Sequence, residues 1–218
     1  YPIVPVLGDK GQSTLEHAEH YNVYTKPDHV YRDGVTEADV KPMLDLVKYV
    51  TNLNQEHYLT IMDWLAFTVQ HPDKKICWAP FFVSGHGIGK STFVKKVAGY
   101  LVGMANFVAP TADDIQGNFN GYLDRSKVVH VDEMPQDKDN SASKIYNKLK
   151  TDISETVLSV NDKFEKARPV RTFGNWIFTV NNLNSIKIEK GDRRLYPVIH
   201  HMSMGLGDDS RKIIEAQC

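Results

Sequence analysis

The sequence contains little cysteine: Cys77 and Cys218 are the only two in 218 residues. Two thiols so far apart are too few for a disulfide-stabilised scaffold or for a thiolate metal site. A reducing setting is the simplest interpretation of this cysteine usage, so we expect the protein to be cytoplasmic.

Long apolar runs and net charge are lacking as well. No stretch approaches the ~20 apolar residues that cross a bilayer, so we expect no membrane partner. The 26 basic and 27 acidic side chains leave a net charge of −1, which restricts any nucleic-acid site to a local patch. Hydrophobic residues at 41% and charged residues at 24% are typical of a soluble globular protein and exclude a disordered or collagen-like chain.

The composition changes along the chain. Residues 1–60 hold five basic and nine acidic side chains, so the remainder is mildly basic. The first residue is a tyrosine, not a methionine, and we expect the chain to be a fragment of a longer polypeptide.

Four parts are expected. Residues 1–35 are irregular, because proline and glycine interrupt every short apolar run. Residues 36–75 form a small helical part, a collar for oligomerisation or simply two packing helices. Residues 76–205 form the core domain, and residues 206–218 begin a C-terminal segment.

The core domain has an α/β pattern. Short apolar runs typical of buried strands alternate with amphipathic segments, which favours a mostly parallel sheet with helices on both faces. The expected helices are 36–50, 55–70, 91–102 and 143–153; the expected strands are 81–83, one near 108, 127–131, a hairpin of 157–160 with 168–173, and 176–180.

A glycine-rich turn between the first strand and its helix is the most informative segment. Its backbone N–H groups and the following helix N-terminus can bind phosphate oxygens. Lys90 would reach the β- and γ-phosphates of ATP, and the Ser91 hydroxyl would bind Mg²⁺. The usual first glycine is replaced by Ser84, and a glycine turn that merely caps a helix stays the alternative. The predicted nucleotide-binding residues are Ser84, Gly85, His86, Gly87, Ile88, Gly89, Lys90, Ser91 and Thr92.

Two later strands also end in polar side chains. Asp132 would hold the metal ion and Glu133 would activate the attacking water. Asn181 would sense the γ-phosphate or help to place that water. A strand that simply enters a polar loop would look the same.

Further cations suggest two more contacts. Arg193 or Arg194 could act as an arginine finger that reaches the nucleotide of a neighbouring subunit, and an ordinary surface pair is the alternative. A hairpin tip that contains Lys163, Phe164, Lys166 and Arg168 could bind nucleic acid, although most such charge runs are only solvated.

These motifs stand in the order found in superfamily 3 helicases, which are AAA+ NTPases, and the resemblance covers roughly Asn22 to His200. Four segments look like the helicase part of phage primase-helicase and primase-polymerase proteins: Asp63-Trp64-Leu65-Ala66, Gln70-His71-Pro72, Phe82-Val83-Ser84-Gly85 and Leu149-Lys150-Thr151.

The resemblance implies an ATP- and Mg²⁺-dependent helicase module of phage genome replication in the host cytoplasm. It implies a ring of subunits, typically a hexamer, that moves on single-stranded DNA. A primase or polymerase domain of the same parent polypeptide would be a further partner. The resemblance also implies that the basic hairpin would face the DNA, that Asn181 would match the sensor, and that Arg193 or Arg194 would act in trans.

Rival classes lack their own motifs. A GTPase needs a guanine-reading motif downstream of the loop, and an ABC ATPase needs Leu-Ser-Gly-Gly, which is missing. A small-molecule kinase would not need a water-activating Glu133. The alternative that stays open is a ring scaffold or loader that binds nucleotide only as an assembly switch.

Overall fold

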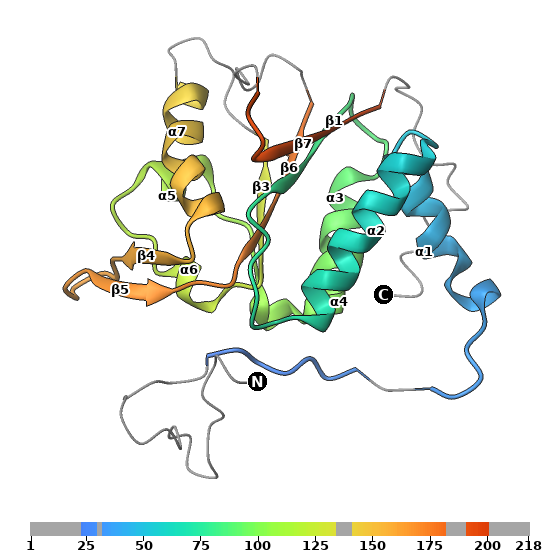
Figure 1. Ribbon diagram of the computed structural model, residues 1–218, viewed down its shortest axis with the longest axis horizontal. Helices are drawn as coiled ribbons and strands as arrows, with labels where there is room; N and C mark the ends of the chain where they lie inside the picture. The colour runs from blue at the N-terminus through green and yellow to red at the C-terminus, as the bar shows by residue number, and fades with distance from the viewer. Residues whose placement is uncertain (1–22, 30–31, 134–140, 182–190, 201–218) are drawn as a thin grey trace.

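A five-stranded sheet runs through the middle of the protein, with helices on both sides (Figure 1). The computed structural model describes residues 23–29, 32–133, 141–181 and 191–200. Residues 1–22 and the predicted C-terminal segment 206–218 lie outside this part. The sheet strands are β1 (Ala79–Val83), β2 (Phe107–Val108), β3 (Val128–Asp132), β6 (Asn175–Val180) and β7 (Leu195–Ile199).

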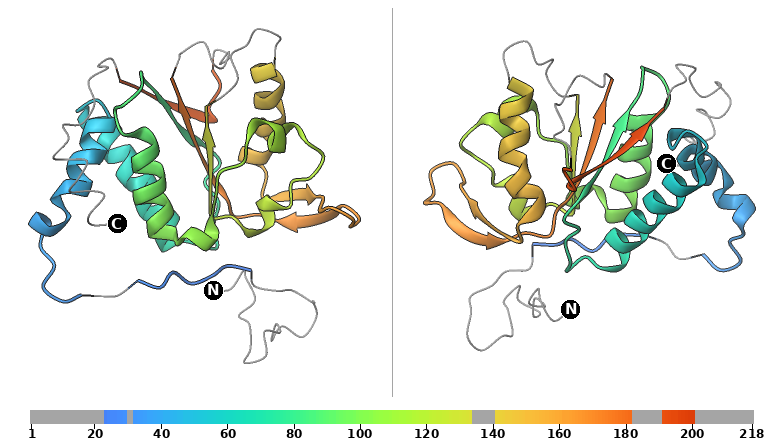
Figure 2. Two further views of the ribbon diagram at one scale, coloured as in Figure 1. Left: turned by 180° about the vertical axis from the view of Figure 1, so that it is seen from behind. Right: turned by 45° about the horizontal axis from the view of Figure 1, so that its top comes forward.

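All neighbouring strands of this sheet are parallel, in the order β2-β3-β6-β1-β7. The order differs from the chain order, so β6 lies between β1 and β3. The carboxyl ends of these three strands therefore meet at one edge of the sheet, towards which their arrowheads point in Figure 2. In open α/β sheets this edge is where ligands bind.

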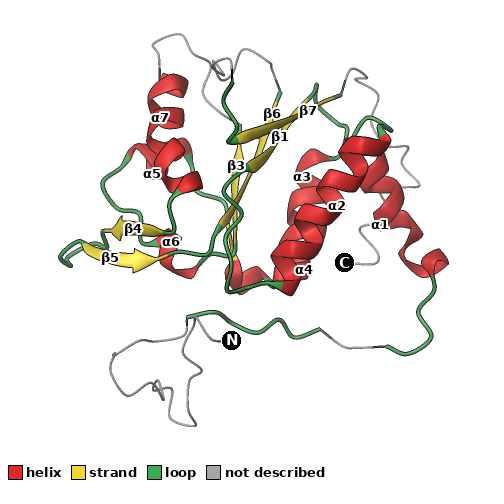
Figure 3. Ribbon diagram, viewed as in Figure 1, coloured by secondary structure: helices red, strands yellow, loops and turns green. Residues whose placement is uncertain are grey.

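Alternate strand residues serve two different cores, as expected for strands covered on both faces. On one face Phe81, Phe178 and Val131 pack with α7 (Ser141–Ser154), α5 (Ala112–Gln116) and α6 (Tyr122–Arg125). On the other face Phe82 and Ile177 pack with the helices of the N-terminal part and with the helix that follows the glycine turn. Figure 3 shows the two helical layers on either side of the sheet. The predicted fold class is confirmed.

The helix after the glycine turn runs continuously from Lys90 to Val102. It comprises α3 (Lys90–Thr92), a π-helical stretch η1 (Phe93–Gly99) and α4 (Tyr100–Val102), and the 3₁₀ turn η2 (Met104–Asn106) leads into β2.

The helical N-terminal part consists of α1 (Glu37–Val50) and α2 (Gln55–Gln70). The expected cap of the first helix is present, because the Asp39 carboxylate accepts from the Thr36 N–H at 2.8 Å. Leu46, Ile61 and Trp64 are buried in the same core as the helix from Lys90 to Val102. The division into four parts and the role of these helices as a collar stay predictions.

The expected hairpin is formed by β4 (Val157–Val160) and β5 (Arg168–Arg171), an antiparallel pair separate from the main sheet. It lies away from the edge where β1, β3 and β6 end (Figure 1).

Three elements were not expected from the sequence: β7, α5 and α6. Strand β7 contains Pro197, which lacks an N–H and argues against a strand inside a sheet. The structure places β7 at the edge of the sheet, where proline is tolerated. The two helices are only five and four residues long, too short for a periodic pattern.

Candidate nucleotide-binding site

A cavity of about 320 Å³ lies at the edge where β1, β3 and β6 end. The chain order alone would not bring these strand ends together, but the position of β6 between the other two does. The lining residues are His86, Gly87, Ile88, Gly89, Lys90, Ser91, Thr92, Asp132, Glu133 and Asn181. Seven of the nine predicted nucleotide-binding residues therefore line one cavity with Asp132, Glu133 and Asn181, whereas Ser84 and Gly85 do not line it.

The glycine-rich turn has the conformation that its composition predicts. Gly87 and Gly89 have φ angles of 83° and 91°, in the left-handed region that favours glycine. Ile88, which lies between the two glycines, is buried, whereas His86 is exposed. The turn is therefore fixed to the core by one side chain while its backbone faces the cavity.

Lys90 is only 7% exposed, and its ammonium contacts four oxygens of three residues. It donates to the Ser84 hydroxyl at 2.6 Å and to the carbonyls of Ser84 and Gly85 at 2.9 and 3.0 Å. It also donates to Asn181 Oδ1 at 3.1 Å. Burial lowers the pKa of Lys90 from its ordinary value, and the nearby carboxylates of Asp132 and Glu133 partly offset this effect.

The Ser91 hydroxyl and the Asp132 carboxylate lie 3.3 to 3.4 Å apart. Both are oxygen ligands of the kind that Mg²⁺ prefers. The Lys95 ammonium is 3.7 Å from the same carboxylate. Burial by itself raises the pKa of Asp132, but a hydrogen bond from Thr179 and the neighbouring basic groups outweigh it and hold that pKa below its usual value.

Glu133 follows directly on β3 and has a φ of 59°, a conformation that non-glycine residues rarely adopt. Its backbone N–H donates to the Thr179 carbonyl at 2.9 Å, which holds this bend against β6. Its carboxylate accepts from Asn181 Nδ2 at 2.7 Å. Asn181 therefore contacts the candidate base with its amide nitrogen and Lys90 with its amide oxygen.

The structure also identifies two polar residues that sequence reasoning missed, Thr179 and His130. The Thr179 hydroxyl donates to Asp132 Oδ1 at 2.6 Å and contacts His130 Nε2 at 2.8 Å. A signal was available, because each residue precedes a predicted site residue by two positions in a strand and so lies on the same face.

The two candidate arginine fingers have different surroundings. Arg194 donates from Nε to Ser154 Oγ at 3.0 Å and lies 3.4 Å from the Asp192 carboxylate, so it is fixed to the end of α7. Arg193 is exposed, and no side-chain partner for it is found within the described part of the chain. Neither arginine lines the cavity.

The hairpin tip presents its predicted nucleic-acid residues to solvent, with one difference. Lys163 and Lys166 are exposed, and Phe164 is 94% exposed with the Lys163 ammonium 5.1 Å from its ring centre. Arg168 instead pairs with Asp124 at 2.7 Å and with Asp162 at 3.5 Å. Its charge is thus already matched within the protein.

A neighbouring segment fixes this hairpin in place. Asn161 N–H donates to Asn120 Oδ1 at 2.7 Å, and Asn120 N–H donates to the Asn161 carbonyl at 3.1 Å. At Gly121 the chain passes close to the hairpin, because a Cβ there would lie 1.6 Å from the Asp162 carboxylate and would require that side chain to move. Phe119, which precedes Asn120 in this segment, is half exposed.

The fold and the site together define the chain as an α/β domain with a mostly parallel sheet and a glycine-rich loop at the carboxyl end of a central strand. The chain belongs to a family of unknown function (DUF5906), whose profile matches residues 82–194, more than half of the sequence.

A curated relative is the DNA primase-polymerase of Nitratiruptor phage NrS-1, which is 29% identical over an alignment of 166 positions and matches 71% of this chain. The match spans only 22% of that relative's length. The resemblance to phage primase-polymerase proteins is thereby confirmed.

Solved structures give the same fold. Two apo structures of the NrS-1 C-terminal region match with TM-scores of 0.67 and 0.69, 21% identity, 88% of this chain and 45% of theirs. A ligand-bound JCV helicase matches with a TM-score of 0.50, 10% identity, 81% of this chain and 48% of its own. At these identities the likeness shows the fold alone.

No helix of the described residues is both long and apolar enough to cross a membrane.

Proposed function

We propose that this chain is an ATP-hydrolysing helicase module of superfamily 3 that moves on single-stranded DNA during phage genome replication. The observation that carries the proposal is the meeting of Lys90, Ser91, Asp132, Glu133 and Asn181 around one cavity, although they come from three strand ends. The homology to a phage DNA primase-polymerase supports the replication setting.

The residues present fit ATP with Mg²⁺. The left-handed glycines turn the backbone of the loop towards the cavity, and Lys90 supplies a positive charge there. Ser91 and Asp132 would hold Mg²⁺, which when bound supplies charge neutralisation at the phosphate oxygens. The remaining ligands of such an ion are usually water and phosphate, so two protein oxygens are enough.

Each remaining residue has one task. Glu133 is exposed at the cavity and would take the proton of the attacking water. Asn181 bonds Glu133 and Lys90 in the structure and would exchange these bonds for the γ-phosphate and the water. The protein would thus bind and orient all reacting groups with side chains already at the cavity.

The subunit of a ring next to this site would supply the finger. Arg193 is the better candidate of the two arginines, because Arg194 is engaged with Ser154 and Asp192. A ring, with six subunits typical of the family, is therefore part of the proposal, as are a primase or polymerase domain of the same polypeptide and a cytoplasmic location.

DNA would bind at the hairpin tip through Lys163, Lys166 and Phe164, all exposed. The ammonium groups would contact phosphates and the ring would stack on a base. Arg168 acts in this proposal as an anchor of the hairpin.

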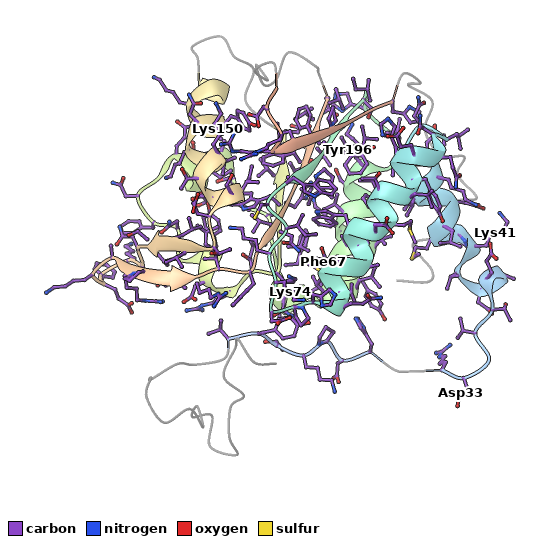
Figure 4. The ribbon with its side chains drawn as sticks, in the orientation of Figure 1. Asp33, Lys41, Phe67, Lys74, Lys150 and Tyr196 are labelled. Atoms are coloured by element: carbon purple, nitrogen blue, oxygen red, sulfur yellow. The ribbon has the colours of Figure 1, made fainter. Side chains whose placement is uncertain are left out.

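The deciding experiment is an ATPase assay, with and without single-stranded DNA, on the wild type and on Lys90→Ala and Glu133→Gln. We expect each variant to lose roughly 100-fold or more of the turnover, because each loses a group that acts on the transition state. Lys41→Ala is the matched control, since Lys41 lies on the outer side of α1, away from the sheet (Figure 4). If the wild type showed no turnover, or if Lys90→Ala left the turnover unchanged, the proposed ATPase activity would be contradicted.

The same assay tests the DNA contact. Lys163→Ala with Lys166→Ala should abolish stimulation by DNA and leave basal hydrolysis intact. Nucleotide binding without any turnover would instead favour a ring scaffold or loader.

A further inference from the structure

We propose that His130 is a positioning residue that acts through the Thr179 hydroxyl to orient Asp132 for metal binding. The inference rests on the proposed function, since it concerns the residue that would hold Mg²⁺. His130 is fully buried and Thr179 is likewise buried, so neither touches a ligand directly.

The sheet register creates this contact. Asp132 and Thr179 are directly paired residues of the parallel strands β3 and β6, and His130 precedes Asp132 by two positions. Because side chains alternate along a strand, His130 and Asp132 lie on the same face of β3. The Thr179 hydroxyl lies between them, 2.8 Å from His130 Nε2 and 2.6 Å from Asp132 Oδ1.

The protons of this chain of hydrogen bonds can be assigned. Asp132 as a carboxylate only accepts, so the single Thr179 proton points to Asp132. His130 Nε2 must then carry a proton and donate it to the Thr179 oxygen, which leaves Nδ1 bare. His130 Nδ1 has no hydrogen-bond partner within the described part of the chain, so a proton placed there would be a buried donor without an acceptor.

The position of the proton on His130 affects how the Asp132 carboxylate is oriented. Thr179 would be free to donate to His130 instead of Asp132 if the imidazole carried its proton on Nδ1. With the proton on His130 Nε2, the Thr179 hydroxyl can donate only to Asp132, so Asp132 Oδ1 stays hydrogen-bonded to Thr179. Both oxygens of the Asp132 carboxylate lie 3.3 to 3.4 Å from Ser91 Oγ. Side chains that orient a metal ligand in this way typically change metal affinity by about 10- to 100-fold when removed.

The first test observes the proton itself in the metal-free full chain. We expect nitrogen-15 NMR of labelled histidine to show one imidazole with a protonated Nε2 and a bare Nδ1 at neutral pH. His130→Gln identifies that signal by its loss. A protonated Nδ1 on His130 would overturn the proposal without any reference to activity.

The second test measures Mg²⁺ dependence. Binding of a fluorescent ATP analogue is titrated at increasing Mg²⁺ in the wild type, Thr179→Val, Thr179→Ser and His130→Leu. We expect the half-saturating Mg²⁺ concentration to rise about tenfold in Thr179→Val and His130→Leu. Thr179→Ser, which keeps the hydroxyl, should stay close to the wild type.

A matched control separates positioning from structural damage. Thr68 is a buried threonine of α2 whose hydroxyl accepts from Asn175 at 2.9 Å. Asn175 begins β6, whereas the cavity lies at the end of that strand. Thr68→Val should lower thermal stability without moving the Mg²⁺ dependence. An unchanged Mg²⁺ dependence in a folded Thr179→Val, beside a wild type that responds to Mg²⁺, would overturn this inference alone. A wild type that binds no nucleotide with Mg²⁺ would overturn the proposed function and this inference with it.

Discussion

Lys90 has more oxygen partners than protons. Its ammonium carries three protons, and four acceptors lie within 3.1 Å, the shortest contact being to the Ser84 hydroxyl. A phosphate group must therefore displace some of these oxygens. Ser84 stands where such loops usually have glycine, so the contact with its hydroxyl is a property of this sequence.

Ser84→Ala tests this competition. We expect the variant to bind ATP roughly 3- to 10-fold more tightly, because one hydrogen bond to a charged group no longer has to be broken. Fluorescence titration of a nucleotide analogue measures the affinity, and Ser91→Ala serves as the opposite case, with weaker binding in the presence of Mg²⁺. Weaker binding by Ser84→Ala would mean that the hydroxyl prepares Lys90 for phosphate instead of competing with it.

At the scale of elements, the hairpin is attached to the segment of residues 120–124 by hydrogen bonds and an ion pair. The tip residue Asn161 exchanges hydrogen bonds with Asn120, and Arg168 pairs with Asp124 from α6. The hydrogen bond from Arg168 to Asp124 also raises the pKa of the guanidinium, as expected for a charge paired with a carboxylate. The two exposed lysines of the tip have a different environment and should behave differently.

Salt dependence separates these two kinds of cation. Lys166→Ala should reduce the slope of log affinity for single-stranded DNA against log salt by about 0.7, because one phosphate contact is lost. Arg168→Ala should leave that slope unchanged and lower the thermal stability of the protein. Filter-binding or anisotropy titrations at several salt concentrations measure both. An equal change of slope in the two variants would place Arg168 on the DNA as well.

At the scale of the whole molecule, a buried lysine joins parts that are distant in the sequence. Lys127 is 2% exposed and donates to the carbonyls of His71, Lys74 and Phe173 at 3.0, 2.6 and 3.2 Å. These carbonyls belong to the segment after α2 and to the end of the hairpin; Lys74 is seen at the lower end of the sheet in Figure 4. Burial lowers the pKa of Lys127 to about 7.

This pKa predicts a pH dependence of stability. The unfolded lysine titrates near its ordinary 10.5, so between pH 7 and 10 the unfolded chain binds more protons than the folded protein. Stability should therefore rise with pH in this window, by at most about 1.4 kcal/mol per pH unit from this group. Denaturant unfolding of the wild type and of Lys127→Met at pH 7.5 and 9.5 measures it. An equal pH response in the two proteins would refute the assignment to Lys127.

The proposed ring of subunits leads to a second prediction at this scale. Arg193→Ala and Lys90→Ala should each be nearly inactive alone, but their mixture should regain part of the turnover. Mixed rings contain interfaces in which the intact Lys90 of one subunit faces the intact Arg193 of its neighbour. Arg194→Ala should mainly reduce thermal stability, because its guanidinium bonds Ser154 and Asp192. A mixture no more active than its components would argue against a finger in trans.

Much of the local structure was predictable because it depends on neighbours in the sequence. The glycine turn, the cap at Thr36 and the helix from Lys90 to Val102 follow from composition and spacing. That Asp132 and Asn181 line the same cavity was predictable only from the family resemblance. The place of Thr179 near the site was predictable only from the two-residue alternation of side chains along a strand. The ion pair of Arg168 could not be predicted from the sequence, because its partner Asp124 is 44 residues away. Direct contact of Arg168 with DNA stays a prediction.

The sequence by itself determined most of the helices and strands, although not β7, α5 and α6, and it determined which loop has the composition to bind phosphate. The near-zero net charge also restricted any nucleic-acid site to a local patch. Only the tertiary structure decided that β6 lies between β1 and β3, and hence that three polar strand ends share one cavity. It also decided which charges are free, leaving Lys163 and Lys166 exposed while Arg168 is paired and Lys127 is buried. The physical reason is that local conformation depends on side chains a few residues apart, whereas strand order and ion pairing depend on packing between segments far apart in the chain.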